Sequence, residues 1–216
     1  MRFDAVLFDC DGVLVDSEPI VNRVLRGMLA ERGWVLSEAE CLAIFLGKMV
    51  KDERARIERE TGQPLTEDWL AAFRARRNAA LEQELAIVVN AREAVHAVHE
   101  RLDARIACAS GADRHKVELQ LRKVGLHGYF DGRIFSGHEM PRSKPHPDVY
   151  LAAAAALRAV PGRCAVVEDS LVGAAAGLAA GATVFAYVPH GDAAPFERAG
   201  VAAVLRDMAQ LPGLLA

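Results

Sequence analysis

Two aspartates near the start of the chain have the spacing and surroundings of a reaction centre. The apolar residues Ala5–Phe8 are followed by Asp9, Cys10, Asp11 and Gly12. Side chains two residues apart on an extended strand point to the same side, so Asp9 and Asp11 can face one site at the end of a buried strand. Two carboxylates this close repel each other unless a cation or a proton relieves the repulsion. Gly12 would let the backbone turn sharply where the strand stops.

Further polar residues follow strand-like segments much later in the chain. They are Ser110 with Gly111, Lys144, and the pair Glu168 and Asp169. Parallel α/β sheets bring the residues that follow their strands to one edge, where such proteins bind their ligands. We therefore expect these residues to meet Asp9 and Asp11 at one edge of a sheet.

The types of these residues fit phosphoryl transfer. A phosphate monoester dianion repels an attacking carboxylate, so a site must neutralise and align the phosphate and protonate the leaving oxygen. Asp9 and Asp169 offer the hard oxygen ligands that suit Mg²⁺. Lys144 adds a compact positive charge, and Ser110 and nearby backbone amides can donate to phosphate oxygens. One of the aspartates Asp9 and Asp11 can then attack as a nucleophile while the other acts as acid and base.

Strand-like and helical segments alternate from residue 86 onward. Together with the first strand, the strand-like segments are Ala5–Phe8, Arg105–Ala109, Arg133–Phe135, Cys164–Val167, Thr183–Val188 and Val201–Leu205. The helical patterns between them are Arg92–Arg101, Arg114–Val124, Pro147–Arg158 and Gly173–Ala180. This alternation predicts an α/β fold with a Rossmann-like, doubly wound parallel sheet that is covered on both faces.

Residues 18–85 differ, because their pattern is almost wholly helical. The predicted helices are Glu18–Arg32, Ser37–Phe45, Lys51–Thr61 and Thr66–Glu84. Ser37 and Glu40 have the spacing of a capping box, and Thr66 is expected to cap the last of these helices. We therefore predict a catalytic core formed by residues 1–16 and 86–216, with an α-helical domain of residues 17–85 inserted after the first strand and a hinge near residues 86–89.

The composition of the chain limits the kinds of partner that it is expected to bind. The chain has 216 residues, of which 52% are hydrophobic, and a formal net charge of −3, so no strong field attracts nucleic acid or an anionic membrane. The four cysteines are scattered, which favours a reducing, cytoplasmic environment over a disulfide scaffold or a zinc site. No signal peptide is visible at the start of the sequence. We expect a small phosphorylated metabolite as partner, with no nucleic acid and no membrane, and a monomer or homodimer.

The stretch from Ser170 to Pro189 has no charged residue, which is a feature of membrane-spanning helices. It carries Gly173, Gly177 and Gly181 at four-residue spacing, which also suits pairs of membrane helices. The stretch is mostly Ala and Gly, however, and its end has strand character. We interpret it as a helix packed tightly on a sheet, with Gly181 ending the helix, followed by a buried strand.

Taken together, the four motifs resemble those of the haloacid dehalogenase superfamily, specifically its members with a helical cap inserted after the first strand. The resemblance covers essentially the whole chain. The segments Phe8–Glu18 and Val167–Gly173 are similar to the signatures of the branch that contains β-phosphoglucomutase and phosphoglycolate phosphatase. The resemblance implies a Mg²⁺-dependent enzyme whose helical region is a mobile cap that closes over the substrate and excludes bulk water.

The resemblance also implies roles for the matching residues. Asp9 would be the nucleophile that forms an aspartyl-phosphate, and Asp11 would protonate the leaving alkoxide and then activate water. Asp9, Asp169 and the backbone carbonyl of Asp11 would bind Mg²⁺, with Glu168 either a further ligand or a partner of the ligands. Ser110, Gly111 and Lys144 would hold the phosphoryl group.

Each motif alone also has a purely structural interpretation. A serine such as Ser110 commonly caps the helix that follows it, a lone lysine such as Lys144 is usually solvated, and Glu168 with Asp169 could form a surface turn. His96 and His99 lie one helical turn apart without further ligands nearby, so a solvated helix face is the favoured interpretation. The co-occurrence of all four motifs favours the catalytic interpretation.

Three reactions compete. A dehalogenase needs no second aspartate as acid, so Asp11 disfavours that reaction. The β-phosphoglucomutase-like enzymes use a histidine after the first motif and an arginine between cap helices, whereas this chain has Ile20 and the segment Lys48–Val50 at the corresponding places. We therefore predict hydrolysis of a small phosphomonoester, such as a sugar phosphate, a phosphorylated sugar acid or phosphoglycolate. The alternatives are a sugar-phosphate mutase and a non-catalytic protein that binds a phosphorylated ligand.

Specificity should come from the cap. Gly47 and Lys48 lie between two predicted cap helices, where the cap of this family reaches toward the substrate. An ordinary surface lysine is the simpler interpretation of Lys48. As a hypothesis, Lys48 contacts a second anionic group of the substrate, such as a carboxylate.

Overall fold

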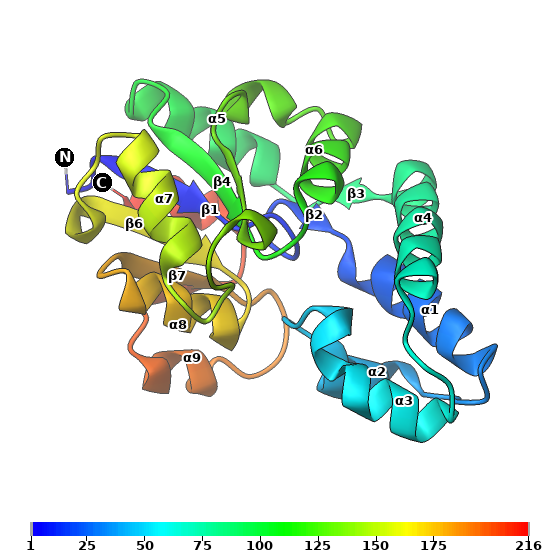
Figure 1. The fold of residues 1–216 in the computed structure, drawn as a ribbon. Helices are drawn as coiled ribbons and strands as arrows, with labels where there is room; N and C mark the ends of the chain where they lie inside the picture. The colour runs from blue at the N-terminus through cyan, green and yellow to red at the C-terminus, as the bar shows by residue number, and fades with distance from the viewer. Residues whose placement is uncertain (1, 216) are drawn as a thin grey trace. The chain divides into compact units, whose positions relative to one another are not determined.

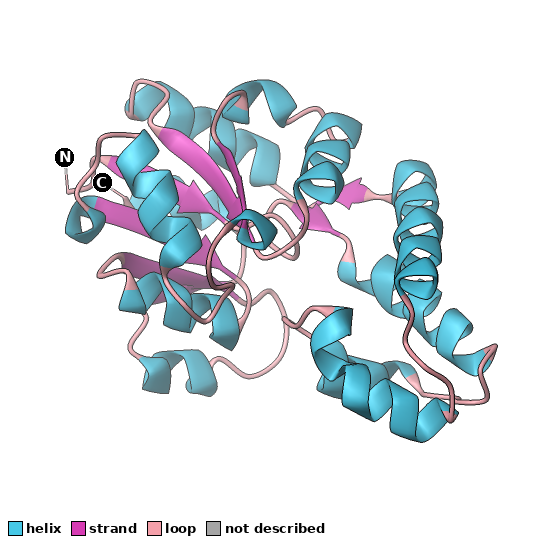
Figure 2. Cartoon of the chain, viewed as in Figure 1, coloured by secondary structure: helices cyan, strands magenta, loops and turns pink. Residues whose placement is uncertain are grey.

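The computed structural model describes residues 2–215, and these residues divide into two compact units. One unit contains the residues up to Asp16 together with those from Ala86 onward, and the other is Ser17–Leu85. The first unit is an α/β structure, whereas the second is helical (Figure 2).

A six-stranded sheet forms the centre of the α/β unit, and every neighbouring pair of its strands is parallel (Figure 1). In spatial order the strands are β5 (Ile134–Ser136), β4 (Ile106–Ser110), β1 (Ala5–Phe8), β6 (Cys164–Glu168), β7 (Thr183–Tyr187) and β8 (Ala203–Leu205). All six lie within two residues of the predicted segments at each end, and the predicted α/β fold class is confirmed. Strand β1 lies inside the sheet, between β4 and β6, both of which come later in the sequence.

The register of the sheet determines which residues lie side by side where neighbouring strands end. Phe8 lies opposite Cys108 of β4 and Val167 of β6. The next backbone amide, that of Asp9, donates to the carbonyl of Val167 at 3.0 Å. Asp9 therefore begins the loop that leaves β1 directly beside the last residues of β4 and β6.

Helices cover both faces of this sheet, as a parallel sheet requires. On one face, α7 (Asp148–Ala156), α8 (Leu171–Ala179) and α9 (Ala194–Ala199) pack on the buried side chains of β1, β4, β6 and β7. On the other, the ring of Phe8 meets the ring of Phe130 edge-on at 6.0 Å. Phe130 belongs to the 3₁₀ segment His127–Phe130, which contacts α5 (Ala91–Arg101) and α6 (Arg114–Lys123). The unit also contains α10 (Leu211–Leu214) and the 3₁₀ segments Gly137–Glu139, Pro161–Arg163 and Met208–Gln210.

The uncharged stretch from Ser170 to Pro189 folds as helix α8, a turn and strand β7. A side chain at Gly177 would place its Cβ 2.8 Å from Val184 and 3.1 Å from Val166, so the glycine lets α8 approach the sheet closely. Gly181 follows the helix with a φ of +81°. Within residues 2–215, no helix combines the length and the apolar character that crossing a membrane requires.

The helical unit has its own apolar core. Its helices are α1 (Glu18–Ala30), α2 (Glu38–Phe45), α3 (Arg54–Thr61) and α4 (Glu67–Glu84), with a 3₁₀ segment at Val50–Glu53. Core residues such as Leu29, Ile57 and Phe73 come from three of these helices. The predicted capping box of Ser37 and Glu40 is present, and the hydroxyl of Thr66 accepts from the backbone amide of Trp69. The predicted helix at Lys51–Thr61 is wrong in its first turn, which is 3₁₀ rather than α.

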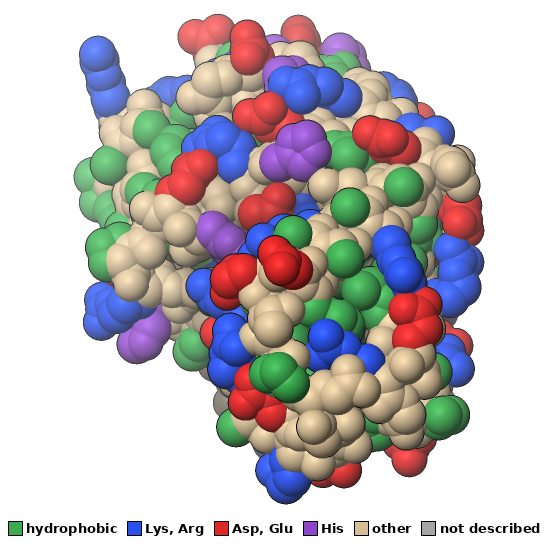
Figure 3. All heavy atoms as spheres, turned by 45° about the vertical axis from the view of Figure 1, so that its right-hand side comes forward, with side chains coloured by type: hydrophobic (Ala, Val, Ile, Leu, Met, Phe, Trp, Pro, Cys, Tyr) green, Lys and Arg blue, Asp and Glu red, His purple; other side chains and the backbone are tan. Residues whose placement is uncertain are grey.

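A short antiparallel ribbon stands where the chain leaves and re-enters the α/β unit. It consists of β2 (Val15–Asp16) and β3 (Ala86–Ile87). On the face drawn in Figure 3, basic and acidic side chains intermingle, in line with the small net charge of −3. All four cysteines are free and buried.

Candidate active site

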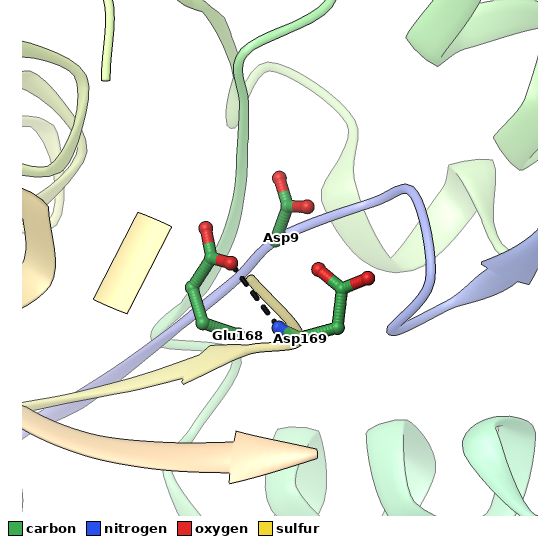
Figure 4. Close-up of side chains that lie close together, drawn as sticks. All are labelled: Asp9, Glu168 and Asp169. Atoms are coloured by element: carbon green, nitrogen blue, oxygen red, sulfur yellow. Dashed lines mark hydrogen bonds between the residues drawn. The ribbon is translucent and has the colours of Figure 1, made fainter. Parts of the chain in front are cut away.

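Three acidic side chains gather at the ends of strands β1 and β6. Oxygen atoms of Asp9, Glu168 and Asp169 all lie within 4.8 Å of one another (Figure 4). Glu168 is the last residue of β6, and Asp169 begins the loop that follows it. Residues distant in sequence are thus brought together by the pairing of β1 with β6.

The glycine after the aspartate pair makes room for one of these carboxylates. Gly12 has a φ of +74°, which confirms the predicted turn. A Cβ at Gly12 would lie 1.9 Å from the Oδ2 atom of Asp169, a distance at which atoms overlap. Any side chain at this position would therefore displace Asp169 and strain the backbone.

Lys144 lies within hydrogen-bonding distance of two of the acidic residues. Its ammonium donates to Oδ1 of Asp9 at 2.9 Å, to Oε1 of Glu168 at 2.6 Å, and to the backbone carbonyl of Ala109 at 3.0 Å. The lysine side chain is only 7% exposed, so these charges interact with little screening by water. The ammonium thus stands directly beside the carboxylate of Asp9.

Both oxygens of Glu168 are occupied by protein donors. Oε1 accepts from Lys144 and from the hydroxyl of Tyr150 at 2.7 Å. Oε2 accepts from the backbone amide of Asp169 at 3.1 Å and from the amide and hydroxyl of Ser170 at 3.2 and 3.0 Å. A fully buried carboxylate with five donors is held in one orientation.

Burial and neighbouring charges shift the pKa values in this cluster. Burial, reinforced by the carboxylates of Glu168 and Asp11 and opposed by Lys144, raises the pKa of Asp9 to about 7. Burial alone would lower the pKa of Lys144, but the carboxylates of Asp9 and Glu168 outweigh it and hold the pKa well above its ordinary value. Lys144 is therefore a permanent cation. A cation bound beside Asp9 would favour the ionised form of this carboxyl group.

Asp11 lies on the same loop as Asp9 but makes different contacts. Its Oδ1 atom accepts from the ammonium of Lys116 at 2.7 Å and from the side-chain amide of Gln120 at 2.8 Å. Both donors belong to helix α6. The side chain of Asp11 thus lies against a charged and a neutral donor, and it is not part of the acidic cluster formed by Asp9, Glu168 and Asp169.

Ser110 ends strand β4 and begins the loop that leads into α6. Its hydroxyl accepts from the backbone amide of Ala112 at 3.1 Å. The interpretation of Ser110 as the cap of the next helix is wrong, because Asp113 occupies that position and accepts from the amide of Lys116. A Cβ at Gly111 would lie 4.0 Å from the side chain of Lys144, so the loop after β4 borders this lysine.

Gly47 and Lys48 belong to the helical unit. Gly47 has a φ of +72°, and the ammonium of Lys48 pairs with Glu53 at 2.5 Å. The lysine side chain is 44% exposed. Its contact with a substrate stays a prediction.

The acidic cluster fits a hard divalent cation. Asp9 and Asp169 offer carboxylate oxygens, and the space at Gly12 lets Asp169 approach the loop after β1. Oxygen ligands of this kind suit Mg²⁺, which keeps few carboxylates and several waters. Glu168 fits less well as a direct ligand, because each of its oxygens already accepts from protein donors.

Comparison with known proteins places the chain in a family. Residues 3–181 match the family model of the haloacid dehalogenase-like hydrolases. The chain belongs to this family. The predicted superfamily is therefore confirmed, as is the prediction that the chain is an enzyme of a hydrolase family.

Relatives of known function and structure agree with this placement. The 6-phosphogluconate phosphatase of Escherichia coli is 31% identical over 192 residues, which are 88% of this chain and 85% of that protein. Hexitol phosphatase B of the same species is 34% identical over 179 residues, or 82% and 79% of the two chains. A haloacid dehalogenase family hydrolase from Deinococcus radiodurans, solved with bound phosphate and sodium, is 38% identical with a TM-score of 0.78 and covers 100% of this chain and 96% of its own.

Sequence reasoning missed the side chains that hold the predicted site residues in place. Lys116, Gln120, Tyr150 and Ser170 all donate to Asp11 or Glu168. The sequence does carry a signal for two of them. Lys116 and Gln120 are polar residues four apart, next to the apolar Val117 and Leu121, and so stand on the inner face of their helix.

Proposed function

We propose that the protein is a Mg²⁺-dependent phosphatase that hydrolyses small phosphomonoesters through an aspartyl-phosphate on Asp9. The observation that carries this proposal is the contact of Asp9 with the ammonium of Lys144, beside the carboxylate of Asp169. A carboxylate in this setting has a cation beside it to offset the charge of an incoming phosphate. The phosphatases among its relatives support the same reaction class.

In the first step, a carboxylate oxygen of Asp9 attacks phosphorus, and the bond from phosphorus to the ester oxygen breaks. Asp11 gives its proton to that oxygen, so the substrate leaves as a neutral alcohol. In the second step, Asp11 takes a proton from water as the water oxygen attacks phosphorus. The bond between Asp9 and phosphorus then breaks and releases inorganic phosphate.

The residues around Asp9 bind and align the phosphoryl group. Lys144 offers a buried positive charge next to the attacking carboxylate, and Ser110 with the backbone of Gly111 offers donors from the loop after β4. Asp9, Asp169 and the backbone carbonyl of Asp11 would hold Mg²⁺, which would supply positive charge to the phosphate oxygens. We assign Glu168 to the orientation of Lys144 rather than to direct metal binding, because its two oxygens are already engaged.

The names of the relatives and the chemistry of the leaving group support one class of substrate. One relative is named a 6-phosphogluconate phosphatase and the other a hexitol phosphatase. In such substrates the leaving group is an alkoxide, which needs the proton that Asp11 would supply. We therefore propose phosphorylated sugars, sugar acids and sugar alcohols as substrates, with water as the phosphoryl acceptor.

A phosphate-release screen with purified protein tests this proposal. The panel contains sugar phosphates, phosphorylated sugar acids, hexitol phosphates, phosphoglycolate and nucleotides, each with Mg²⁺ and with EDTA. We expect release from the polyol and sugar-acid phosphates that is lost with EDTA and restored by added Mg²⁺. Conversion of β-glucose 1-phosphate to glucose 6-phosphate without phosphate release would indicate a mutase instead. Binding without turnover of any panel member would refute the enzyme assignment.

A further inference from the structure

Helix α6 presents two donors to a single oxygen of Asp11. Lys116 and Gln120 lie four residues apart, and both reach Oδ1, at 2.7 and 2.8 Å. The lysine side chain is 9% exposed and Gln120 is fully buried. A buried lysine and a buried glutamine are costly unless their donors are satisfied, so this contact is built into the packing of the helix.

The two contacts leave no room for a proton on Oδ1. A carboxyl oxygen has two lone pairs, and two N–H donors use both of them. Any proton that Asp11 carries must therefore be on Oδ2. The contacts thus select which oxygen of Asp11 exchanges protons.

The side-chain oxygen of Gln120 also has a partner, which fixes the orientation of the amide group. The thiol of Cys10 donates to Oε1 of Gln120 at 3.5 Å, while the amide nitrogen of the same side chain faces Asp11. The carboxylate oxygen of Asp11 can only accept hydrogen bonds, so the group of Gln120 that faces it must be the N–H donor. Cys10, which lies between the two aspartates in the sequence, thus keeps this amide turned toward Asp11.

The start of α6 ties this arrangement to the loop that follows β4. The carboxylate of Asp113 caps the helix by accepting from the backbone amide of Lys116 at 3.0 Å. Three residues before this cap stands Ser110, which is 1% exposed. The helix that holds Asp11 therefore begins directly at the loop proposed to bind the phosphoryl group.

We propose that Lys116 and Gln120 are positioning residues for proton transfer by Asp11, which hold Oδ1 so that Oδ2 exchanges the proton. The proposal rests on the proposed function of Asp11 as acid and base. The competing interpretation is that the pair only fills and neutralises a buried site. In that case its removal would affect all substrates alike.

Two substrates that differ in their leaving group separate these interpretations. An alkyl phosphate such as a hexitol phosphate needs a proton on its leaving oxygen, whereas p-nitrophenyl phosphate has a leaving group stable as an anion. The ratio kcat/KM reports the steps up to release of the alcohol, before water attacks. In Lys116→Met and Gln120→Met we expect kcat/KM for the alkyl phosphate to fall on the order of 10²-fold, with a much smaller loss for p-nitrophenyl phosphate.

Three controls accompany this measurement. Lys123→Met removes an exposed lysine from the same helix and should leave kcat/KM unchanged for both substrates. Lys116→Arg keeps a charged donor and should recover part of the alkyl phosphate activity. Asp11→Asn should show the same selective loss as the two methionine variants, but a larger one.

Several outcomes would overturn the proposal. An equal loss for both substrates, or no loss for the alkyl phosphate, would show that the pair does not position the acid, even though Asp11→Asn behaves as expected. Full alkyl phosphate activity in Asp11→Asn would instead refute the proposed function itself. A crystal structure of the double variant Lys116→Met, Gln120→Met gives a readout independent of activity. An Asp11 carboxyl group that keeps its present orientation there would overturn the positioning role.

Discussion

Ion pairs in the two units of the molecule differ in how far they are removed from water. In the α/β unit, Asp9, Lys144 and Glu168 are removed from water and contact one another. In the helical unit, pairs such as Arg76 with Glu31 stand at the surface, with side chains 53% and 56% exposed. Burying ions costs several kcal/mol each, whereas exposed pairs contribute about 0–1 kcal/mol. A protein accepts the larger cost where charges must act on a substrate, so this difference supports our proposal that the α/β unit carries the chemistry.

Replacing the central carboxylate should give the largest effect. In Asp9→Asn we expect Mg²⁺-dependent phosphate release to fall by on the order of 10⁴-fold or more, because an amide is a poor nucleophile. The measurement is steady-state release from the best substrate of the screen. Asp4→Asn is the matched control, since Asp4 precedes the same strand but pairs with Arg163 at the surface. Comparable activity in Asp9→Asn and the wild type would refute the proposed mechanism.

Replacing a glycine by alanine should change the free energy of unfolding in opposite directions in the two units. Gly173 in α8 leaves no space, because an added Cβ would lie 1.8 Å from Oε1 of Glu168. We expect Gly173→Ala to lower the free energy of unfolding by roughly 1–3 kcal/mol and to lower kcat as Glu168 is displaced.

Gly27 provides the counterpart in the helical unit. It is an exposed residue inside α1, and an added Cβ would meet no atom within 4 Å. Gly27→Ala should raise the free energy of unfolding by about 0.5–1 kcal/mol without changing kcat. Urea denaturation of both variants measures the two signs. Equal effects would mean that the close packing around Glu168 tolerates an added methyl group.

Lys48 tests whether the helical unit contributes to substrate choice. We expect Lys48→Ala to raise KM for a phosphorylated sugar acid on the order of tenfold, because a hydrogen bond between charged groups is lost. KM for a neutral sugar phosphate should change much less. Lys51→Ala removes another exposed lysine from the same region and serves as control. An equal rise for both substrates would contradict a contact of Lys48 with a second anionic group.

The smallest effect should come from a surface ion pair of the helical unit. Arg76→Met removes the partner of Glu31, and we expect the free energy of unfolding to change by less than about 0.5 kcal/mol. Lys144→Met, which leaves the buried Asp9 and Glu168 without their shared cation, should lower it by roughly 3–5 kcal/mol. Chemical denaturation of both variants gives the comparison. Similar losses would mean that the contrast between buried and exposed charges does not extend to stability.

The sequence could predict the architecture because its signals are local. Apolar segments such as Ala5–Phe8 and Cys164–Val167 mark buried strands, and the polar residues after them mark the edge at which a parallel sheet gathers ligands. For this reason the structure places Lys144 and Asp169 beside Asp9 as the motifs suggested. The roles of these residues stay predictions until variants are measured.

Other features could not be read from the sequence, because they depend on contacts between distant segments. Whether Glu168 is a ligand or a partner of ligands depends on what its two oxygens meet, and this includes Tyr150 on another helix. The sequence pattern puts Lys116 and Gln120 on the inner face of their helix, but it does not show that the loop after β1 lies against them. The alternative interpretation of Ser110 as a helix cap is wrong for a local reason, since Asp113 lies three residues later and accepts from the backbone amide of Lys116 in the first turn of the helix.

The central place of strand β1 in the sheet has a consequence for how the chain is made. β1 is synthesised before both of its partners, which lie around residues 106–110 and 164–168. At about 5–20 residues per second, the strand that carries Asp9 waits roughly 8–30 s for β6 to emerge from the ribosome. The helical unit is complete by residue 85 and has its own apolar core, so it can fold during this interval. Until β6 emerges, β1 lacks its pairing partner on that side, so the segment that carries the proposed nucleophile stays open to aggregation and proteolysis.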